Sequence, residues 1–247
     1  MQVKLIAHTP NAEQIVAAAA KLCYASADID TVMDGLTPEK TERFLNMLTE
    51  LGHESPIEHV TFTFGIEGVS RALLAQITRH RIASFSVQSQ RYVKENTLTY
   101  ITPPAVAEDP ETAALYEQTM TDIYAAYQNL AATLEQKYSA TMDAKAAQKK
   151  AIEDARFVLP NACATKMMMT MNARSLLNFF SLRCCNRAQW EIRALATEMC
   201  KLVRKVAPTL FRFAGPPCVR GKCAEGSMTC GKAAEIRKQF LGDKANG

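Results

Sequence analysis

The feature of this 247-residue sequence that most constrains its fold is an alanine-rich, charged stretch from about residue 110 to residue 156. After Pro110 the stretch contains neither glycine nor proline, the two residues that most often interrupt a helix. It therefore predicts one long helix or a helical hairpin, and it favours a helix-rich fold for the chain.

Shorter elements are predicted before that stretch. Residues 2–7 indicate a short strand. The Thr-Pro pair at 9–10 has the cap and first-turn residues of a helix that runs to about Tyr24. The same pair recurs at 37–38, where it predicts an amphipathic helix that ends at Gly52.

Strand patterns follow. Residues 58–65 alternate apolar and polar side chains and predict a half-buried strand. Residues 70–79 indicate a helix, and residues 91–102 contain a β-favouring run that two prolines close. In the strand predicted at 58–65, one face carries Val60, Phe62 and Phe64 and is expected to be buried.

The second half of the chain is less uniform. Residues 164–171 fit either a helix or a strand, because methionine is common in both. Asn186 and Gln189 resemble a capping box before an amphipathic helix that ends near Pro208. The pattern as a whole predicts a helix-rich, single α+β domain with a small, mostly antiparallel sheet. We place this domain at residues 1–214, before a tail at 215–247 that is rich in cysteine, glycine and lysine.

Composition and charge favour an ordinary globular protein over other classes. Hydrophobic residues make up 48% of the chain and charged residues 22%, which is typical of a globular protein. The 29 basic residues exceed the 25 acidic residues by too little to indicate a nucleic-acid-binding protein. No export signal or membrane-spanning run is evident, so we expect a cytoplasmic protein with reduced cysteines.

Residues 79–92 (RHRIASFSVQSQRY) place four basic side chains close to three serines. So much hydrogen-bonding capacity is poorly suited to a core. A guanidinium can meet a phosphate with two parallel hydrogen bonds, and a serine hydroxyl can complete the coordination of an anion. The segment therefore predicts an anion-binding site, and a solvated basic loop is the alternative.

The same segment resembles the signature of the flavin-dependent thymidylate synthase family. Two other blocks, at 52–64 and 156–192, are similar to family blocks in the same order, and this agreement is too extended to arise by chance. The signature residues that match are Arg79, His80, Arg81, Ser84, Ser89, Arg91 and Tyr92.

The resemblance implies the fold of that family and the methylation of dUMP to dTMP. Methylenetetrahydrofolate would donate the carbon, and FAD reduced by NADPH would supply the hydride. It also implies a homotetramer with sites shared between subunits, and no catalytic metal.

The resemblance assigns the site residues as follows. The residues implied to bind dUMP are Gln76, Arg79, Ser89, Arg91, Arg156 and Arg183. The residues implied to bind FAD are Ser55, Arg79, His80, Arg81, Val87, Asn172, Arg174, Asn178 and Arg187. Arg174 and Asn178 are four residues apart and would share one helix face.

Arg183 is the predicted catalytic residue. Its guanidinium stays protonated, so it can stabilise negative charge on the uracil carbonyl but cannot act as a base. By position alone, a structural cation at a helix C-terminus is the alternative.

Two departures from the family pattern keep alternatives open. Ser86 and Val87 stand where the family commonly has asparagine and an acidic residue, so only a backbone contact is carried over to Val87. Arg187 stands where relatives can present histidine. A homologue that binds flavin and nucleotide without methyl transfer is the alternative function, and a nucleic-acid-binding protein is a more distant one.

The tail carries Cys218, Cys223 and Cys230. They could surround a metal ion with a fourth ligand, but their spacing is not that of a standard zinc knuckle, so free or redox-responsive thiols are favoured. The candidates for a fourth ligand are Cys184, Cys185 and Cys200.

Overall fold

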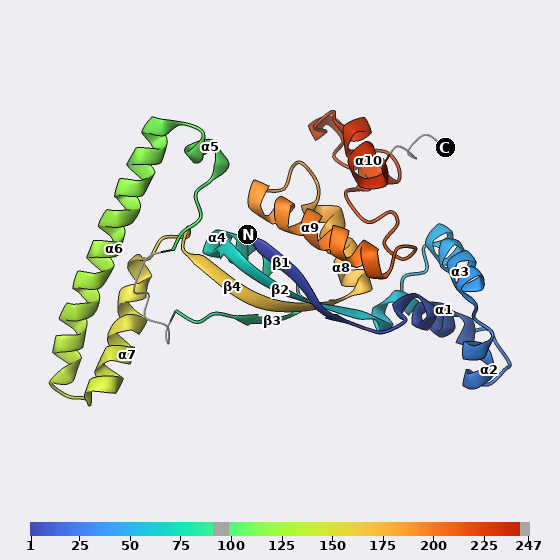
Figure 1. The fold of residues 1–247 in the computed structure, drawn as a ribbon, viewed down its shortest axis with the longest axis horizontal. Helices are drawn as coiled ribbons and strands as arrows, with labels where there is room; N and C mark the ends of the chain where they lie inside the picture. The colour runs from blue at the N-terminus through green and yellow to red at the C-terminus, as the bar shows by residue number, and fades with distance from the viewer. Residues whose placement is uncertain (91–98, 243–247) are drawn as a thin grey trace. The chain divides into compact units, whose positions relative to one another are not determined.

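The computed structural model describes residues 1–90 and 99–242, and contacts divide the chain into two compact units (Figure 1). Unit 1 comprises residues 1–66, 76–86 and 168–247, and unit 2 comprises residues 67–75 and 87–167. The tail predicted at 215–247 falls in unit 1. The boundary at residue 214 stays a prediction.

A four-stranded antiparallel sheet has the strand order β1-β2-β4-β3. The α+β class with a small sheet and many helices, predicted from the sequence, is confirmed. The strands are β1 (Gln2–His8), β2 (Thr61–Ser70), β3 (Ser84–Val87) and β4 (Ala164–Asn172).

Strand β2 buries alternate side chains, as the sequence predicts. Phe62 and Phe64 are fully buried, and the apolar alternation continues through Ile66, so the strand runs further than residue 65. Its predicted start at residue 58 is wrong, because Pro56 opens a 3-10 turn, η1 (Pro56–His59).

The methionine-rich segment is a strand. Met167, Met169 and Met171 of β4 are buried, whereas Met168 is 49% exposed, because successive side chains of a strand point to opposite faces. Periodicity of two therefore resolves a segment that residue preferences leave ambiguous.

The strand predicted within residues 91–102 is only partly testable, because residues 91–98 lie outside the described part of the chain. Tyr100 forms an isolated antiparallel bridge with Cys163, and no longer ladder includes residues 99–102. Pro103 follows directly and cannot donate to a ladder, which limits the pairing to this bridge.

The helices of unit 1 are α1 (Ala12–Leu22), α2 (Ile29–Asp34), α3 (Pro38–Leu51), α8 (Ala173–Arg183), α9 (Trp190–Val206) and α10 (Ala233–Leu241), with the 3-10 turns η3 (Pro217–Val219) and η4 (Gly226–Met228). Helix α1 packs against α2 and α3, α8 packs against α9, and α10 packs against η3. In Figure 1, α8 and α9 lie along one face of the sheet. Helix α4 (Arg71–Ile77) begins in unit 2 and ends in unit 1.

Both predicted ends of α3 are confirmed. The Thr37 hydroxyl accepts a hydrogen bond from the Lys40 backbone N–H at 3.3 Å, and Pro38 occupies the first turn. Gly52 ends the helix with a left-handed φ of 69°.

The start predicted for α1 is wrong. Thr9 continues the pairing of β1, because its backbone N–H donates to the Thr61 carbonyl at 3.0 Å and its hydroxyl accepts from the Thr61 N–H at 2.9 Å. The helix begins only at Ala12, after Asn11 has turned the chain with a φ of 50°.

The predicted cap of α9 is displaced by one turn. The Gln189 side-chain carbonyl accepts from the N–H groups of Glu191 and Ile192, at 3.0 and 3.2 Å, so Gln189 is the N-cap. Asn186 instead accepts two hydrogen bonds from Arg193, through its backbone and side-chain oxygens.

The predicted helical hairpin forms the main part of unit 2. Asp143 interrupts the helical run by capping α7 through the N–H groups of Lys145 and Ala146, at 3.0 and 3.1 Å. The Tyr138 hydroxyl donates to Asp154 at 2.6 Å and joins the two helices. The helical elements of unit 2 are α5 (Pro104–Ala107), α6 (Pro110–Ser139), α7 (Ala144–Ala155) and the 3-10 turn η2 (Arg156–Val158).

Despite the length of α6, no helix within residues 1–90 or 99–242 combines the length and apolar character needed to cross a membrane.

One cation anchors the C-terminal part of unit 1. The guanidinium of Arg204 on α9 donates to four backbone carbonyls. A charged donor shared among several carbonyls fixes the chain that follows α9 and the last turn of α10. The acceptors are the carbonyls of Phe211, Arg212, Ala214 and Phe240.

We predict that Gly52→Ala lowers the free energy of unfolding by about 1–2 kcal/mol, because an alanine is strained at a left-handed φ. No atom lies within 4 Å of the position of an added Cβ, so the cost is that of the backbone alone. Urea unfolding measures it. Gly221→Ala is the matched control, since Gly221 also has open space around it and no left-handed φ, and it should change stability by less than about 0.5 kcal/mol. Equal effects of both substitutions would contradict the prediction.

Candidate active site

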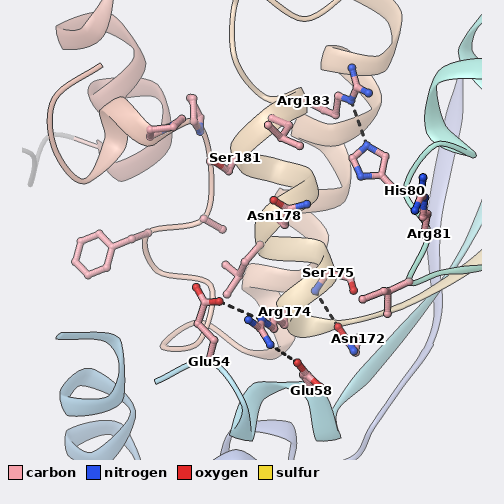
Figure 2. A pocket seen from close by; sticks show the side chains of 18 of the residues that line it. Glu54, Glu58, His80, Arg81, Asn172, Arg174, Ser175, Asn178, Ser181 and Arg183 are labelled. Carbon is pink, nitrogen blue, oxygen red and sulfur yellow. Dashed lines mark hydrogen bonds and ion pairs between the residues drawn. The ribbon is translucent and has the colours of Figure 1, made fainter. Parts of the chain in front are cut away.

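A cavity of about 980 Å³ lies in unit 1 between α8, the segment after α4 and the chain that follows α9. Figure 2 shows the side chains of α8 directed into it. Its polar lining includes Glu54, Glu58, Arg79, His80, Arg81, Asn172, Arg174, Ser175, Asn178, Ser181, Arg183 and Arg220.

Positive charge dominates this cavity. Five arginines line it against two glutamates. Like charges held this close repel one another, so the free energy of the protein falls when an anion enters. The cavity is therefore suited to an anionic ligand, as residues 79–92 alone indicate.

Helix α8 forms one side of the cavity and determines how far apart its polar side chains lie. The Asn172 side-chain oxygen caps the helix by accepting from the Ser175 N–H at 2.8 Å. Arg174 and Asn178 then project into the cavity one turn apart, as their four-residue spacing predicts. Arg183 lies at the far end of the same helix and lines the same cavity.

Arg174 is held by two carboxylates. Its Nε donates to Glu54 Oε2 at 3.1 Å and its Nη1 donates to Glu58 Oε1 (Figure 2). The hydrogen bond to Glu58 is the main cause of a raised pKa of Arg174. All three side chains are about half exposed, so the pairs orient the guanidinium and leave it accessible to a competing anion.

Arg183 is oriented by a histidine. Its Nε donates to His80 Nε2 at 3.2 Å, and the His80 ring packs edge-on against Phe179 with ring centroids 5.0 Å apart. Burial, and then the charges of Arg183 and Arg79, lower the pKa of His80. The ring is therefore neutral at neutral pH, with Nε2 as an acceptor and the proton on Nδ1.

Burial and the charge of Arg79 also lower the pKa of Arg183. A guanidinium nevertheless stays charged, because its ordinary pKa is far above neutrality. Arg183 is the last residue of α8, where a structural cation at a helix end is also expected, but its Nε–H is directed to His80.

The structure brings most of the predicted unit 1 residues together and leaves three apart, namely Ser55, Gln76 and Arg187. Ser55 and Gln76 do not line the cavity. The Ser55 carbonyl accepts the Glu58 N–H at the start of η1, and Gln76 lies in α4. The predicted residues that do line it are Arg79, His80, Arg81, Asn172, Arg174, Asn178 and Arg183.

The other predicted dUMP residues and Val87 belong to unit 2, described here by itself. Val87 ends β3, and Ser89 follows it by two positions. The Nε of Arg156 donates to the Glu153 carbonyl at 3.2 Å. Arg91 lies outside the described residues.

Arg187, a predicted FAD contact, does not line this cavity but a smaller one of about 210 Å³. Its Nε pairs with Glu225 at 3.4 Å and its Nη1 donates to the Met228 carbonyl at 3.2 Å. The guanidinium thus joins the α8–α9 loop to the tail.

Sequence reasoning missed two parts of the cavity. The first part is Glu54 and Glu58, which line the cavity and stand on either side of the Ser-Pro pair at 55–56. The sequence signal that could have indicated them is the presence of two acidic residues in the block at 52–64, near an arginine-rich signature. The tail was treated as an appendage, yet Pro216, Pro217 and Arg220 line the cavity as well.

Comparisons with known proteins cover nearly the whole chain. A family described as "Thymidylate synthase complementing protein" matches residues 4–209. A flavin-dependent thymidylate synthase of Clostridium tetani is 57% identical to this chain, over 98% of this chain and 97% of that protein. One of Geobacter sulfurreducens is 50% identical over 97% and 98%, and one of Pyrococcus horikoshii is 37% identical over 92% and 91%.

We predict that His80 makes the fold less stable in acid. Its folded pKa lies below the ordinary 6.5, so the unfolded chain takes up the proton first and stability falls as pH drops below about 6.5. His80→Gln keeps a side-chain oxygen that can accept from Arg183 and cannot be protonated. The fall in melting temperature from pH 8 to pH 5.5 should therefore be smaller in this variant.

The control for this measurement is His59→Gln, which makes the same replacement at an exposed histidine that does not line the cavity. It should keep the acid dependence of the unmodified protein. An acid dependence that His80→Gln leaves unchanged would refute the assignment of a neutral, hydrogen-bond-accepting His80.

Proposed function

This chain belongs to the flavin-dependent thymidylate synthase family, and from that membership we propose a role for each group in its cavity. It is an enzyme that methylates dUMP to dTMP, with methylenetetrahydrofolate as carbon donor and FAD, reduced by NADPH, as hydride source. The observation that carries the assignment of the site is that the RHR signature and α8, about 90 residues apart, line one cationic cavity.

The residues present suit FAD. The cavity of about 980 Å³ has room for a dinucleotide, and its guanidinium groups match two phosphates. Arg81 and Arg174 would hold the phosphates, and the amides of Asn172 and Asn178 would bond to polar groups of the cofactor. When bound, FAD supplies the hydride that reduces the transferred carbon.

In this proposal, Glu54 and Glu58 hold the guanidinium of Arg174 until a phosphate of FAD binds it. They neutralise and orient Arg174 while no phosphate is bound, which lowers the cost of gathering so many cations. An incoming phosphate then competes with two half-exposed carboxylates for one guanidinium. The exchange replaces one charge-assisted contact by another and does not require the desolvation of an unpaired charge.

For dUMP we propose Arg79 and Arg183 from this cavity, together with Gln76, Ser89, Arg91 and Arg156. Arg183 stabilises the negative charge that develops on a uracil carbonyl as the ring attacks its electrophile. His80 fixes the direction of this guanidinium through the 3.2 Å hydrogen bond. Since a fixed donor needs no reorganisation during the reaction, it stabilises the transition state more than a mobile one does.

We further propose the characteristic fold of this family for the chain, a homotetramer that shares its sites between subunits, and a location in the cytoplasm. Ile82 and Leu182 support the shared site, because these two apolar side chains line the cavity and are 71% and 53% exposed. Sedimentation should give a mass of about four chains of 27.3 kDa each. A monomer that carries out the full reaction would contradict the shared site.

Arg183→Ala should lower kcat by about a hundred- to a thousandfold, because it removes a donor used mainly in the transition state. The FAD content should change little. Thymidylate formation under low oxygen, with FAD absorbance recorded on the same sample, measures both. The control is Arg43→Ala, an exposed arginine on α3 that does not line the cavity, which should keep full activity. An unchanged kcat in Arg183→Ala would exclude the catalytic role.

Arg174→Ala should weaken FAD binding by roughly 10- to 100-fold, as expected for the loss of about 1.5–3 kcal/mol from a charge-assisted hydrogen bond. Titration of the flavin-free protein with FAD gives the dissociation constant, and far-UV circular dichroism reports whether the variant is folded. Arg43→Ala again serves as the control. Retention of full FAD affinity by a folded Arg174→Ala protein would place the phosphates elsewhere.

A further inference from the structure

Four thiols gather where the tail meets the α8–α9 loop. Cys185, Cys218 and Cys223 line one cavity of about 210 Å³. Cys230 lies next to this group, because its Sγ accepts a hydrogen bond from the side chain of Asn186, the residue after Cys185, at 3.6 Å. Three tail cysteines thus converge on one cysteine from a distant part of the sequence.

The small cavity distinguishes between the candidates for a fourth ligand. Cys185 lines it together with Cys218 and Cys223, whereas Cys184 and Cys200 do not line it and are both buried in the core. The structure therefore selects Cys185 as the partner of the tail cysteines.

A single metal ion does not fit these thiols as the structure places them. Within residues 1–90 and 99–242, no three histidine, cysteine or acidic side chains lie close enough together to hold one. Four thiolates around a zinc ion would stand about 3.8 Å apart, given Zn–S bonds of about 2.3 Å. Thiolates around an iron–sulfur cluster stand farther apart, since each binds a different iron of a polynuclear core.

The surroundings suit such a cluster. A cluster held by four thiolates is anionic, and Arg183 and Arg187 line the same small cavity. Gly226 and Gly231 have left-handed φ values of 53° and 74°, so the tail can turn tightly around a bound group.

We propose that Cys185, Cys218, Cys223 and Cys230 bind an iron–sulfur cluster that fixes the tail beside the active-site cavity. The two cavities share lining residues, among them Arg183 and Pro217, so the cluster supports the wall that carries Arg183. The inference is independent of the proposed roles in methyl transfer, because it depends only on the four thiols and their setting.

The test uses the full chain, produced and purified without oxygen. We expect about four iron and four acid-labile sulfide ions per chain, as for a [4Fe–4S] cluster, and a paramagnetic resonance signal after reduction with dithionite. The signal is needed because flavin absorbs in the same region as the cluster. Reconstitution with ferrous iron and sulfide should restore the iron if purification strips it.

Three results would overturn the proposal. One zinc per chain without iron would indicate a mononuclear site. A metal-free protein with four additional thiols that react with an aromatic disulfide reagent would indicate free cysteines. A metal-free protein in which these thiols are already oxidised would indicate disulfides. Each result is read on the unmodified protein, so none depends on whether a variant folds.

Matched cysteine variants assign the ligands. Cys218→Ser and Cys223→Ser should each lose more than about nine-tenths of the bound iron, because both sulfurs are placed as direct ligands. Cys23→Ser is the control, since Cys23 is an exposed thiol at the end of α1 outside the small cavity, and it should keep the iron of the unmodified protein. Full iron content in both ligand variants would refute the four-cysteine assignment.

Discussion

The guanidinium groups of the active-site cavity repel one another, and the surrounding parts of unit 1 must compensate for this repulsion. Five arginines face one space, and two of the opposing charges are the carboxylates that pair with Arg174. An unpaired charge that is also desolvated costs several kcal/mol, so these groups are kept partly exposed and oriented from outside. Arg183 differs from Arg174, because its hydrogen-bond partner is the neutral side chain of His80 and not a carboxylate. A neutral acceptor directs the guanidinium without cancelling the charge that its chemistry needs.

Rigid support for this arrangement comes from a series of aromatic contacts that starts in the sheet. Phe62 of β2 meets Phe211 with ring centroids 5.2 Å apart, and Phe211 meets Phe180 at 6.2 Å. Phe180 contacts Phe179, whose ring packs against His80 at 5.0 Å. Aromatic rings have few rotamers, and edge-to-face contacts add specific geometry to their burial. The position of the histidine is thereby tied to a strand of the core. Arg204 holds the carbonyl of Phe211 and extends the same support to the tail.

Local features were predictable from the sequence, and features that depend on distant partners were not. Thr37 and Gly52 bound α3 because a cap and a left-handed glycine act within one turn. Thr9 has the same local sequence signal, but its hydroxyl and N–H bond to Thr61, 52 residues away, and the helix start moves. Much of the cationic half of the cavity follows from the RHR signature and the helical spacing of α8. The acidic half does not, because nothing local pairs Glu54 with a guanidinium 120 residues later.

The strand order also determines when the sheet can form as the chain is synthesised. Strand β2 neighbours β4, and Thr63 bonds to Thr170 across 107 residues at 2.9 Å. More than two thirds of the chain must therefore leave the ribosome before this sheet is complete. Until then β2, which carries Phe62 and Phe64, lacks one of its two neighbouring strands. The α6–α7 hairpin closes over a short connection and precedes β4 in the chain, so its contacts can form before the sheet is complete. Slow translation through α8 would prolong the exposure of β2 and make the nascent chain more dependent on chaperones.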